Sequence, residues 1–328
     1  MPSTPAPPAP PSRPDIHILA VSKLMPLFAQ QLDAAFSLHD RLHETDPAAF
    51  AALAPQIRAI AASGESKVSA ALINSLPALQ VISVMGVGYD GVDVAAAKTR
   101  GVVVTHTPDV LNDDVADLAI GLMLSAARQL PQADRFVRDG QWLKGAMPLA
   151  RKMSGARLGL VGIGRIGQAI AQRALAFNMS VAYTARSPRT SLPWRYFADA
   201  TALAAESDFL VIITPGGAAT RHMIDAGVLA GLGAKGILVN VARGSVVDEV
   251  ALIDALERGV IAGAGLDVFA DEPRVPDRLR ALPQVVLTPH VGSATAATRQ
   301  AMADLAFDNL RLHFAGQALR TPVPECQS

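Results

Sequence analysis

Short apolar runs alternate with segments of helical spacing along most of the chain. Each run predicts a buried strand, and the segments between them carry apolar residues every three to four positions, as amphipathic helices do. The predicted strands are residues 16–21, 79–85, 102–105, 157–161, 180–184, 209–213, 236–241, 263–268 and 284–287. The predicted helices are residues 25–36, 68–76, 93–100, 113–139 with an interruption at Pro131, 166–177, 249–258 and 295–314. This alternation predicts an α/β fold built from parallel βαβ units.

A glycine-rich turn lies between the predicted strand at 157–161 and the helix that follows it. Such a turn after a strand and before a helix is typical of dinucleotide-binding units, where one glycine permits the tight turn, one leaves space for a pyrophosphate and one lets the helix lie close to the sheet. Backbone N–H groups and the helix dipole then hold the phosphates. The residues predicted to bind the cofactor here are Gly162, Ile163, Gly164, Arg165, Ile166 and Gly167. A purely structural glycine turn is the alternative.

The six strands from residue 157 onward predict a doubly wound parallel-sheet (Rossmann) dinucleotide-binding domain over residues 107–295. It is inserted into a smaller flavodoxin-like α/β substrate domain made of residues 15–106 and 296–328. The helix at 113–139 is long enough to cross between the two domains, and Asp113, Asp114 and Asp117 in its first turn are expected to cap it and face solvent. Residues 1–14 contain many prolines and predict a disordered tail.

Composition narrows the possible partners. The 328 residues carry 29 basic and 29 acidic side chains, a formal net charge of zero, which argues against a broad nucleic-acid surface or a charged membrane surface. The single cysteine, Cys326, excludes an intrachain disulfide or a cysteine metal site, and no metal site is predicted. No apolar run has the length needed to span a bilayer. A reducing, cytoplasmic location fits these features.

The segment after the strand at 180–184 indicates which dinucleotide is bound. NAD-binding units carry an acidic residue there that accepts hydrogen bonds from the ribose hydroxyls. This chain has Arg186 instead, followed by Ser187 and Arg189. Two guanidinium groups and a hydroxyl suit a 2′-phosphate, which an acid would repel. The sequence therefore predicts a preference for NADPH over NADH, with an exposed loop that is basic by chance as the alternative.

Three polar residues follow three later strands of the same predicted sheet. Arg243, Glu272 and His290 each lie just beyond a strand, and ligands of open parallel sheets bind outside the carboxyl ends of the strands. Arg243 can hold a carboxylate or a carbonyl oxygen, His290 can transfer a proton, and Glu272 can orient the imidazole and favour its charged form. Separately, each could be a turn or loop residue without catalytic function. Among the other histidines, only His106 lies near a strand end.

Several motifs resemble the D-isomer-specific 2-hydroxyacid dehydrogenase family. They are the glycine turn at 162–167, Asn-Val-Ala-Arg-Gly-Ser at 240–245, Ala-Gly-Leu-Asp-Val-Phe at 264–269 with Glu272-Pro273, and Pro-His-Val-Gly-Ser at 289–293. The resemblance extends through residues 107–111 and 114–121, and it is greatest to the glyoxylate/hydroxypyruvate reductases, including plant-type hydroxyphenylpyruvate reductases.

This resemblance implies roles for further residues. Asp267 matches the anchor of the nicotinamide carboxamide, and Thr214 and Pro215 match residues beside the adenosine half of the cofactor. Val241, Ala242, Arg243, His290 and Gly292 complete the implied cofactor contacts. Val87 and Gly88 match backbone N–H groups that hold the substrate carboxylate, together with Arg243 and His290. The resemblance also implies a homodimer, with residues 113–150 as the contact.

The resulting hypothesis is an NADPH-dependent oxidoreductase that reduces a small 2-oxo acid of the glyoxylate/hydroxypyruvate type to the D-2-hydroxy acid. His290, paired with Glu272, would donate the proton. Two alternatives stay open. One is a reductase for a larger 2-oxo acid, such as hydroxyphenylpyruvate or 2-ketogluconate, and the other is a regulatory protein that senses dinucleotides with the same fold.

Overall fold

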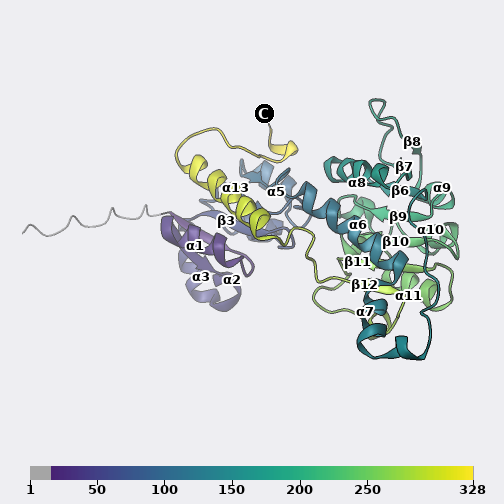
Figure 1. Cartoon of the computed structure of the whole chain (residues 1–328). Coiled ribbons are helices and arrows are strands. Elements are labelled where there is room, and N and C mark those ends of the chain that lie inside the picture. The colour runs from purple at the N-terminus through teal and green to yellow at the C-terminus, as the bar shows by residue number, and fades with distance from the viewer. Residues whose placement is uncertain (1–15, 328) are drawn as a thin grey trace, which may run out of the picture. The chain divides into compact units, whose positions relative to one another are not determined.

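A computed structural model describes residues 16–327 of the chain. The predicted tail, residues 1–14, lies outside the described residues. The chain divides into two compact units: the first contains the chain up to Pro108 and again from Gln300, and the second spans Asp109–Arg299 (Figure 1). Each unit is built around one parallel sheet, as the α/β prediction requires. Between residues 16 and 327, no helix is both long and apolar enough to cross a membrane.

The first unit holds a five-stranded sheet in the order β2-β1-β3-β4-β5, in which every neighbouring pair is parallel. Its strands are β1 (His17–Ala20), β2 (Ser37–Asp40), β3 (Ile57–Ser63), β4 (Val81–Met85) and β5 (Val103–Thr105). Its helices are α1 (Pro26–Ala35), α2 (Leu42–Thr45), α3 (Pro47–Leu53), α4 (Ala70–Asn74), α5 (Val94–Thr99) and most of α13 (Ala296–Phe314).

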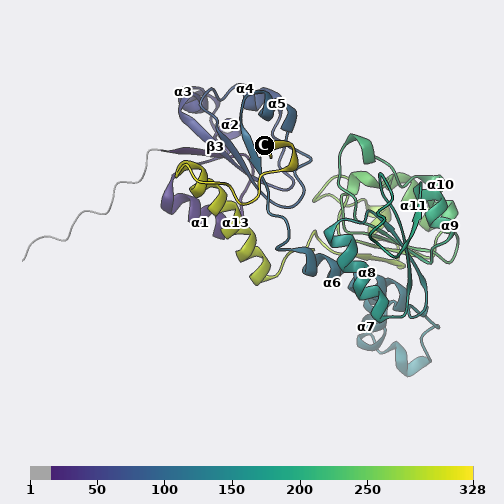
Figure 2. The same cartoon turned by 90° about the horizontal axis from the view of Figure 1, so that it is seen from above.

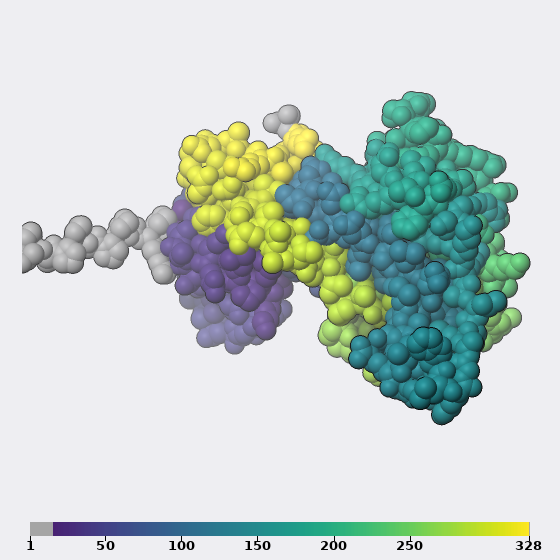
Figure 3. Space-filling view, in the orientation of Figure 1, coloured from purple at the N-terminus to yellow at the C-terminus, as the bar shows by residue number. Residues whose placement is uncertain are grey.

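The C-terminal helix α13 returns to the sheet of the first unit. It lies beside α1, and Figure 3 shows its yellow surface against the purple N-terminal part of the chain. The Ser83 hydroxyl of β4 donates to the carbonyl oxygen of Ala306 at 2.9 Å, and Gln31 of α1 donates to Asp304 at 2.6 Å. Both contacts join segments more than 200 residues apart, so the first unit is complete only when the chain has passed through the second.

The second unit holds a seven-stranded parallel sheet in the order β12-β11-β10-β9-β6-β7-β8. Helices α6 and α8 pack together on one face, while α9, α10 and α11 cover the other (Figure 2). Its strands are β6 (Arg157–Val161), β7 (Ser180–Thr184), β8 (Arg195–Phe197), β9 (Phe209–Ile212), β10 (Ile237–Asn240), β11 (Gly263–Leu266) and β12 (Val285–Leu287). Its helices are α6 (Asn112–Arg128), α7 (Leu130–Arg138), α8 (Arg165–Ala176), α9 (Ala200–Ala205), α10 (Ala226–Leu232), α11 (Glu249–Glu257) and α12 (Asp277–Arg280).

Three strands were not predicted, because their side chains lack the pattern of a buried strand. β2 is a partly exposed edge strand, and β8 is a three-residue edge strand that pairs only with β7. β3 is rich in alanine, a residue that favours helices, yet it lies buried in the middle of its sheet. The surrounding strands override the local propensity.

One helix prediction was wrong in extent. The helix expected at 68–76 is only α4, because Val68 instead forms a parallel bridge with Val92. The helix expected at 113–139 has nearly the predicted extent and breaks close to the predicted place. The helices α6 and α7 are separated at Gln129, which has a left-handed φ of 52°, and Pro131 lies within the first turn of α7. Neither part crosses between the units, since both lie within the second.

The three aspartates near the start of α6 were expected to cap the helix, but its N-cap residue is Leu111 and has no side-chain capping hydrogen bond. The aspartates bond to neighbouring elements instead. Arg173 of α8 pairs with Asp113 at 2.9 Å and with Asp117 at 2.5 Å, while Asp114 accepts a hydrogen bond from the Thr295 hydroxyl at 2.6 Å. The aspartates therefore join α6 to its neighbours, which spacing along one helix cannot show.

Candidate active site

The glycine turn connects β6 to α8 with contacts that no side chain could replace. Gly162 has a φ of 105°, and a Cβ there would lie 2.8 Å from the Ile213 carbonyl oxygen. A Cβ on Gly167 would lie 2.6 Å from the carbonyl oxygen of Gly162. Two of the three glycines are thus required by close backbone packing.

The remaining glycine faces open space. A Cβ on Gly164 would meet no atom within 4 Å, and Gly164 caps α8 without a side-chain hydrogen bond. The first N–H groups of the helix, those of Arg165 and Ile166, have no acceptor among the described residues, and the helix dipole favours negative charge there. Thr214 lies beside this turn, since its backbone nitrogen is 2.9 Å from the position of a Cβ on Gly162. These residues fit the pyrophosphate of a dinucleotide.

The loop after β7 presents the basic residues that the sequence singled out. Arg186, Ser187 and Arg189 are all exposed. Within residues 16–327, neither guanidinium forms an ion pair. Some other arginines of this unit are paired: Arg157 bonds Asp208 at 3.2 Å, and Arg165 bonds Asp109 at 3.1 Å. Both loop guanidiniums are therefore available to a ligand phosphate.

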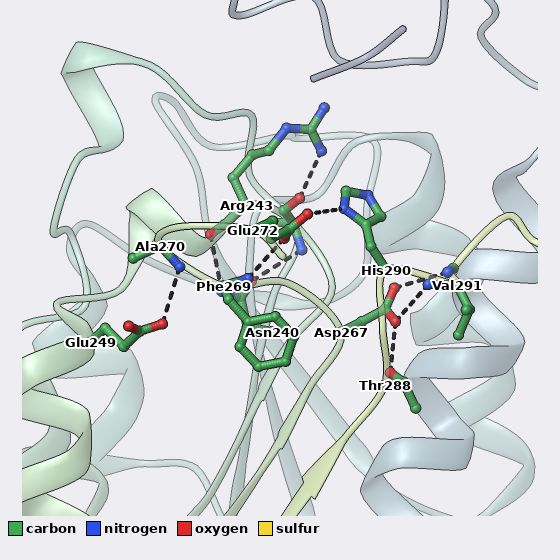
Figure 4. Close-up of polar contacts among 12 residues, drawn as sticks. Asn240, Arg243, Glu249, Asp267, Phe269, Ala270, Glu272, Thr288, His290 and Val291 are labelled. Atoms are coloured by element: carbon green, nitrogen blue, oxygen red, sulfur yellow. Dashed lines mark hydrogen bonds and ion pairs between the residues drawn. The ribbon is translucent and has the colours of Figure 1, made fainter. Parts of the chain in front are cut away.

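Glu272 and His290 form a hydrogen-bonded pair beyond the ends of β11 and β12 (Figure 4). The His290 Nδ1 atom lies 2.8 Å from Glu272 Oε2, and the side chains are 29% and 23% exposed. The other carboxylate oxygen of Glu272 accepts a hydrogen bond from the Phe269 N–H at 2.9 Å. The carboxylate is thereby oriented by the backbone, and it orients the imidazole in turn. Such a pair can hold and deliver a proton.

Asp267 organises the loop that carries His290. Its carboxylate, 2% exposed, accepts hydrogen bonds from the Thr288 hydroxyl at 2.6 Å and from the N–H groups of Val291 and Gly292, both at 2.8 Å. His290 itself has a left-handed φ of 52° and donates its N–H to the Asp267 carbonyl oxygen at 2.9 Å. Thr288 was not predicted. Its role depends on a contact between two strand ends, which the sequence alone does not reveal.

Arg243 follows β10, from which it is separated by Val241 and Ala242. Asn240 shapes this segment: its amide donates to the Arg243 carbonyl oxygen and accepts from the Ala242 N–H, both at 3.0 Å. The guanidinium Nη1 donates to the Ala242 carbonyl oxygen at 2.8 Å, and Val241 and Ala242 are buried. The half-buried Arg243 side chain extends above the same edge of the sheet as Glu272 and His290 (Figure 4).

The loops that carry Arg243 and Glu272 pack directly against each other. A Cβ on Gly244 would lie 1.9 Å from the carbonyl carbon of Phe269, so only glycine fits. Glu249, in the first turn of α11, accepts a hydrogen bond from the Ala270 N–H at 3.0 Å. Glu249 was also not predicted, and it ties the loop carrying Glu272 to a helix of the same unit.

The loop predicted to hold the substrate carboxylate belongs to the first unit. Val87 and Gly88 follow β4 and are partly exposed. Among the described residues, no oxygen accepts a hydrogen bond from either N–H group. His106 Nδ1 lies 2.9 Å from the Val87 carbonyl oxygen, so this histidine near a strand end helps to hold the loop. Backbone N–H groups of this kind can bind an anion.

Comparison with known proteins agrees with this geometry. Residues 120–292 match the family model of the D-isomer specific 2-hydroxyacid dehydrogenase, NAD binding domain. The chain belongs to this family. It is 48% identical over 267 residues to a glyoxylate/hydroxypyruvate reductase of Arabidopsis thaliana, covering 81% of this chain and 85% of the relative. It is 44% identical over 309 residues to a hydroxyphenylpyruvate reductase of Plectranthus scutellarioides, covering 94% and 99% of the two chains.

A solved structure of the family has the same fold throughout. The NADPH-dependent glyoxylate/hydroxypyruvate reductase of Sinorhizobium meliloti, crystallised with NADP and malonate, superposes with a TM-score of 0.90 at 46% identity and covers 95% of this chain and 98% of its own. This dehydrogenase is therefore an oxidoreductase whose second unit is the family's NAD-binding domain.

Proposed function

We propose that this dehydrogenase reduces a small 2-oxo acid of the glyoxylate/hydroxypyruvate type to the D-2-hydroxy acid with NADPH. The observation that carries the proposal is the 2.8 Å pair between Glu272 and His290 beyond the strand ends of a dinucleotide-binding unit. The names of the Arabidopsis thaliana and Sinorhizobium meliloti relatives support the substrate class. In this proposal the first unit is the substrate unit.

Separate residues of the chain bind the substrate, donate the proton and hold the cofactor. Arg243 and the N–H groups of Val87 and Gly88 hold the substrate carboxylate, because a guanidinium and free amides both stabilise negative charge. His290, kept in orientation by Glu272 at Nδ1, donates a proton from Nε2 to the oxygen of the reacting carbonyl. When bound, the reduced dinucleotide supplies the hydride for the 2-oxo carbon. The glycine turn, Thr214, Pro215 and the segment 241–243 hold the cofactor, while Asp267 and Gly292 border the nicotinamide.

The preference for NADPH rests on the loop after β7. Arg186 and Arg189 are exposed and make no ion pair with any described residue, and no carboxylate follows β7 at the position where NAD-binding units carry an acid. The NADPH-dependent relative from Sinorhizobium meliloti supports the same preference. The cytoplasmic location stays a prediction.

The homodimer is proposed from the end of α7 and the segment between α7 and β6. Val137, Trp142, Leu143 and Leu149 are 57%, 69%, 94% and 100% exposed. Large apolar side chains gathered in one segment are typical of an interface between proteins. Replacing Leu143 and Leu149 by glutamate should convert a dimer into monomers in analytical ultracentrifugation. A wild-type monomer at micromolar concentration would contradict the proposal.

The reaction is tested by following NADPH oxidation with glyoxylate and with hydroxypyruvate, and by determining the chirality of the glycerate formed from hydroxypyruvate. Comparing kcat/KM for NADPH and NADH tests the cofactor. The double variant Arg186→Ala/Arg189→Ala should lower the ratio of kcat/KM for NADPH to kcat/KM for NADH by about tenfold or more, because the charge-assisted contacts of both arginines to the 2′-phosphate are lost. Arg195→Ala is the matched control, since that exposed arginine lies over the Phe197 ring instead. A wild-type preference for NADH would refute the cofactor assignment.

A further inference from the structure

Two tyrosines hold the loop that carries Arg186 and Arg189. We infer that Tyr183 and Tyr196 are positioning residues that fix the conformation of residues 185–189 for binding a 2′-phosphate, and so contribute to cofactor selectivity. This inference rests on the proposed NADPH preference. It adds two residues whose hydroxyls bond the backbone of the loop at Arg189 and Ala185.

Tyr183 anchors the far end of the loop from inside the protein. It belongs to β7 and is 1% exposed, so its ring is fixed by the surrounding core. Its hydroxyl accepts a hydrogen bond from the Arg189 N–H at 2.7 Å and lies 3.4 Å from the Arg189 carbonyl oxygen, to which it donates. A buried phenol with its hydroxyl used in this way holds the backbone of Arg189 at one place.

Tyr196 anchors the near end. It lies on β8 directly opposite Tyr183 in the parallel pairing of the two strands. Its hydroxyl donates to the Ala185 carbonyl oxygen at 3.3 Å, and the two rings are tilted by 58° with centroids 5.6 Å apart. The ring contact couples the two anchors. The strand β8, which extends the sheet by only three residues, thereby contributes to the loop.

Fixing the two ends matters because residues 186–188 make no hydrogen bond to another described residue. At the far end, the Leu192 N–H also donates to the Arg189 carbonyl oxygen at 3.0 Å. The side chains of Arg186, Ser187 and Arg189 are exposed, and neither arginine pairs with a described acid. A loop already in its binding conformation loses less entropy when a phosphate binds. A ligand without the 2′-phosphate makes no use of these groups. Loosening the anchors should therefore weaken only ligands that carry the phosphate.

The experiment compares two probes that differ by that phosphate alone: adenosine 2′,5′-bisphosphate and AMP. Their dissociation constants are measured by calorimetry for the wild type, Tyr183→Phe and Tyr196→Phe. Tyr183→Phe should weaken the bisphosphate by roughly three- to tenfold, the effect of one lost hydrogen bond, and leave AMP within about twofold. Tyr196→Phe should have a smaller effect of the same kind, because its bond is longer. In the Arg186→Ala/Arg189→Ala variant, adding Tyr183→Phe should not change the ratio of the dissociation constants of the bisphosphate and AMP any further.

The chain offers a matched control, because its third tyrosine, Tyr89, lies in the first unit and bonds Glu325. Tyr89→Phe should bind both probes as the wild type does. Equal weakening of both probes by the Tyr183 and Tyr196 variants would show a general structural role and overturn the inference. The inference would also be overturned if the wild type bound the bisphosphate more tightly than AMP and both Tyr183→Phe and Tyr196→Phe left the ratio of the two dissociation constants unchanged. If the wild type itself binds both probes equally, the proposed NADPH preference fails, and the inference falls with it.

Discussion

The two units have the same architecture, a parallel sheet covered by helices, yet they present different chemistry at the carboxyl ends of their strands. In the second unit the strand ends carry charged side chains, Arg243, Glu272 and His290, each attached to a loop held by partly buried hydrogen bonds. In the first unit the strand end after β4 presents backbone N–H groups of Val87 and Gly88.

This difference determines which substitutions should matter. A side chain that performs chemistry can be removed while the backbone stays in place, so the second unit should lose activity without losing its fold. A backbone site changes only when the main chain moves, so the first unit should be sensitive to steric changes at glycine and tolerant of side-chain truncation. The following experiments test this contrast.

The largest effect is expected at His290. Replacement of His290 by asparagine removes the proton donor, and kcat should fall by about a hundredfold or more while the dissociation constant of NADPH stays near the wild-type value. His222→Asn is the matched control, because His222 is an exposed histidine of the same unit with a similar left-handed φ, 49° against 52°. Asparagine tolerates that conformation in both places. Near-normal turnover of the His290 variant would refute the catalytic assignment.

A backbone change in the first unit should come next. A Cβ on Gly86 would lie 2.8 Å from the Cα of Gly64, so Gly86→Ala must shift the loop that holds Val87 and Gly88. We expect KM for the 2-oxo acid to rise by roughly tenfold, about the loss of one charge-assisted hydrogen bond, with cofactor binding unchanged. Val87→Ala, which keeps the N–H group, should change KM less than about threefold. Equal effects of the two variants would mean that the Val87 side chain carries the interaction.

A smaller effect is expected at Thr288, which bonds Asp267 behind the loop of His290. Thr288→Val removes one of the hydrogen bonds to this buried carboxylate and should lower kcat by about three- to tenfold with a smaller change in KM. Thr288→Ser keeps the hydroxyl and should restore most of the rate. If serine and valine reduced kcat equally, packing of the methyl group would explain the loss, and the proposed positioning role would be wrong.

The smallest effect concerns the stability of the first unit against acid. Burial and the nearby Arg58 charge lower the pKa of His313 from its ordinary value of 6.5. The unfolded chain therefore takes up a proton first as pH falls, and stability is lost on acidification below about 6.5. His313→Gln should reduce the drop in melting temperature between pH 8 and pH 6, by about 1–3 °C. The control His222→Gln, in the second unit, should show the same fall in melting temperature between pH 8 and pH 6 as the wild type. If His313→Gln also showed the wild-type fall, groups other than His313 would cause the loss of stability in acid.

Much of the site was predictable because its residues follow buried strands. Once apolar runs mark the strands of a parallel sheet, the residues just beyond Asn240, Leu266 and Leu287 must lie along one edge. The glycine turn was predictable for a similar reason, since its spacing reflects steric needs that the chain meets locally. β3 was missed because its alanines carry no strand signal, and β8 was missed because three residues are too few to show a pattern.

The sequence by itself therefore determined the fold class, the dinucleotide turn, and which polar residues lie at the strand ends, because each depends on local patterning and on the geometry common to all parallel sheets. Tertiary structure alone decided how those residues are supported. Thr288 beneath the His290 loop, Glu249 behind Glu272, and the tyrosine anchors at residues 185 and 189 all depend on contacts between separate elements. Side-chain hydrogen bonds of this kind follow from distances between chain segments, and no spacing along the sequence encodes them.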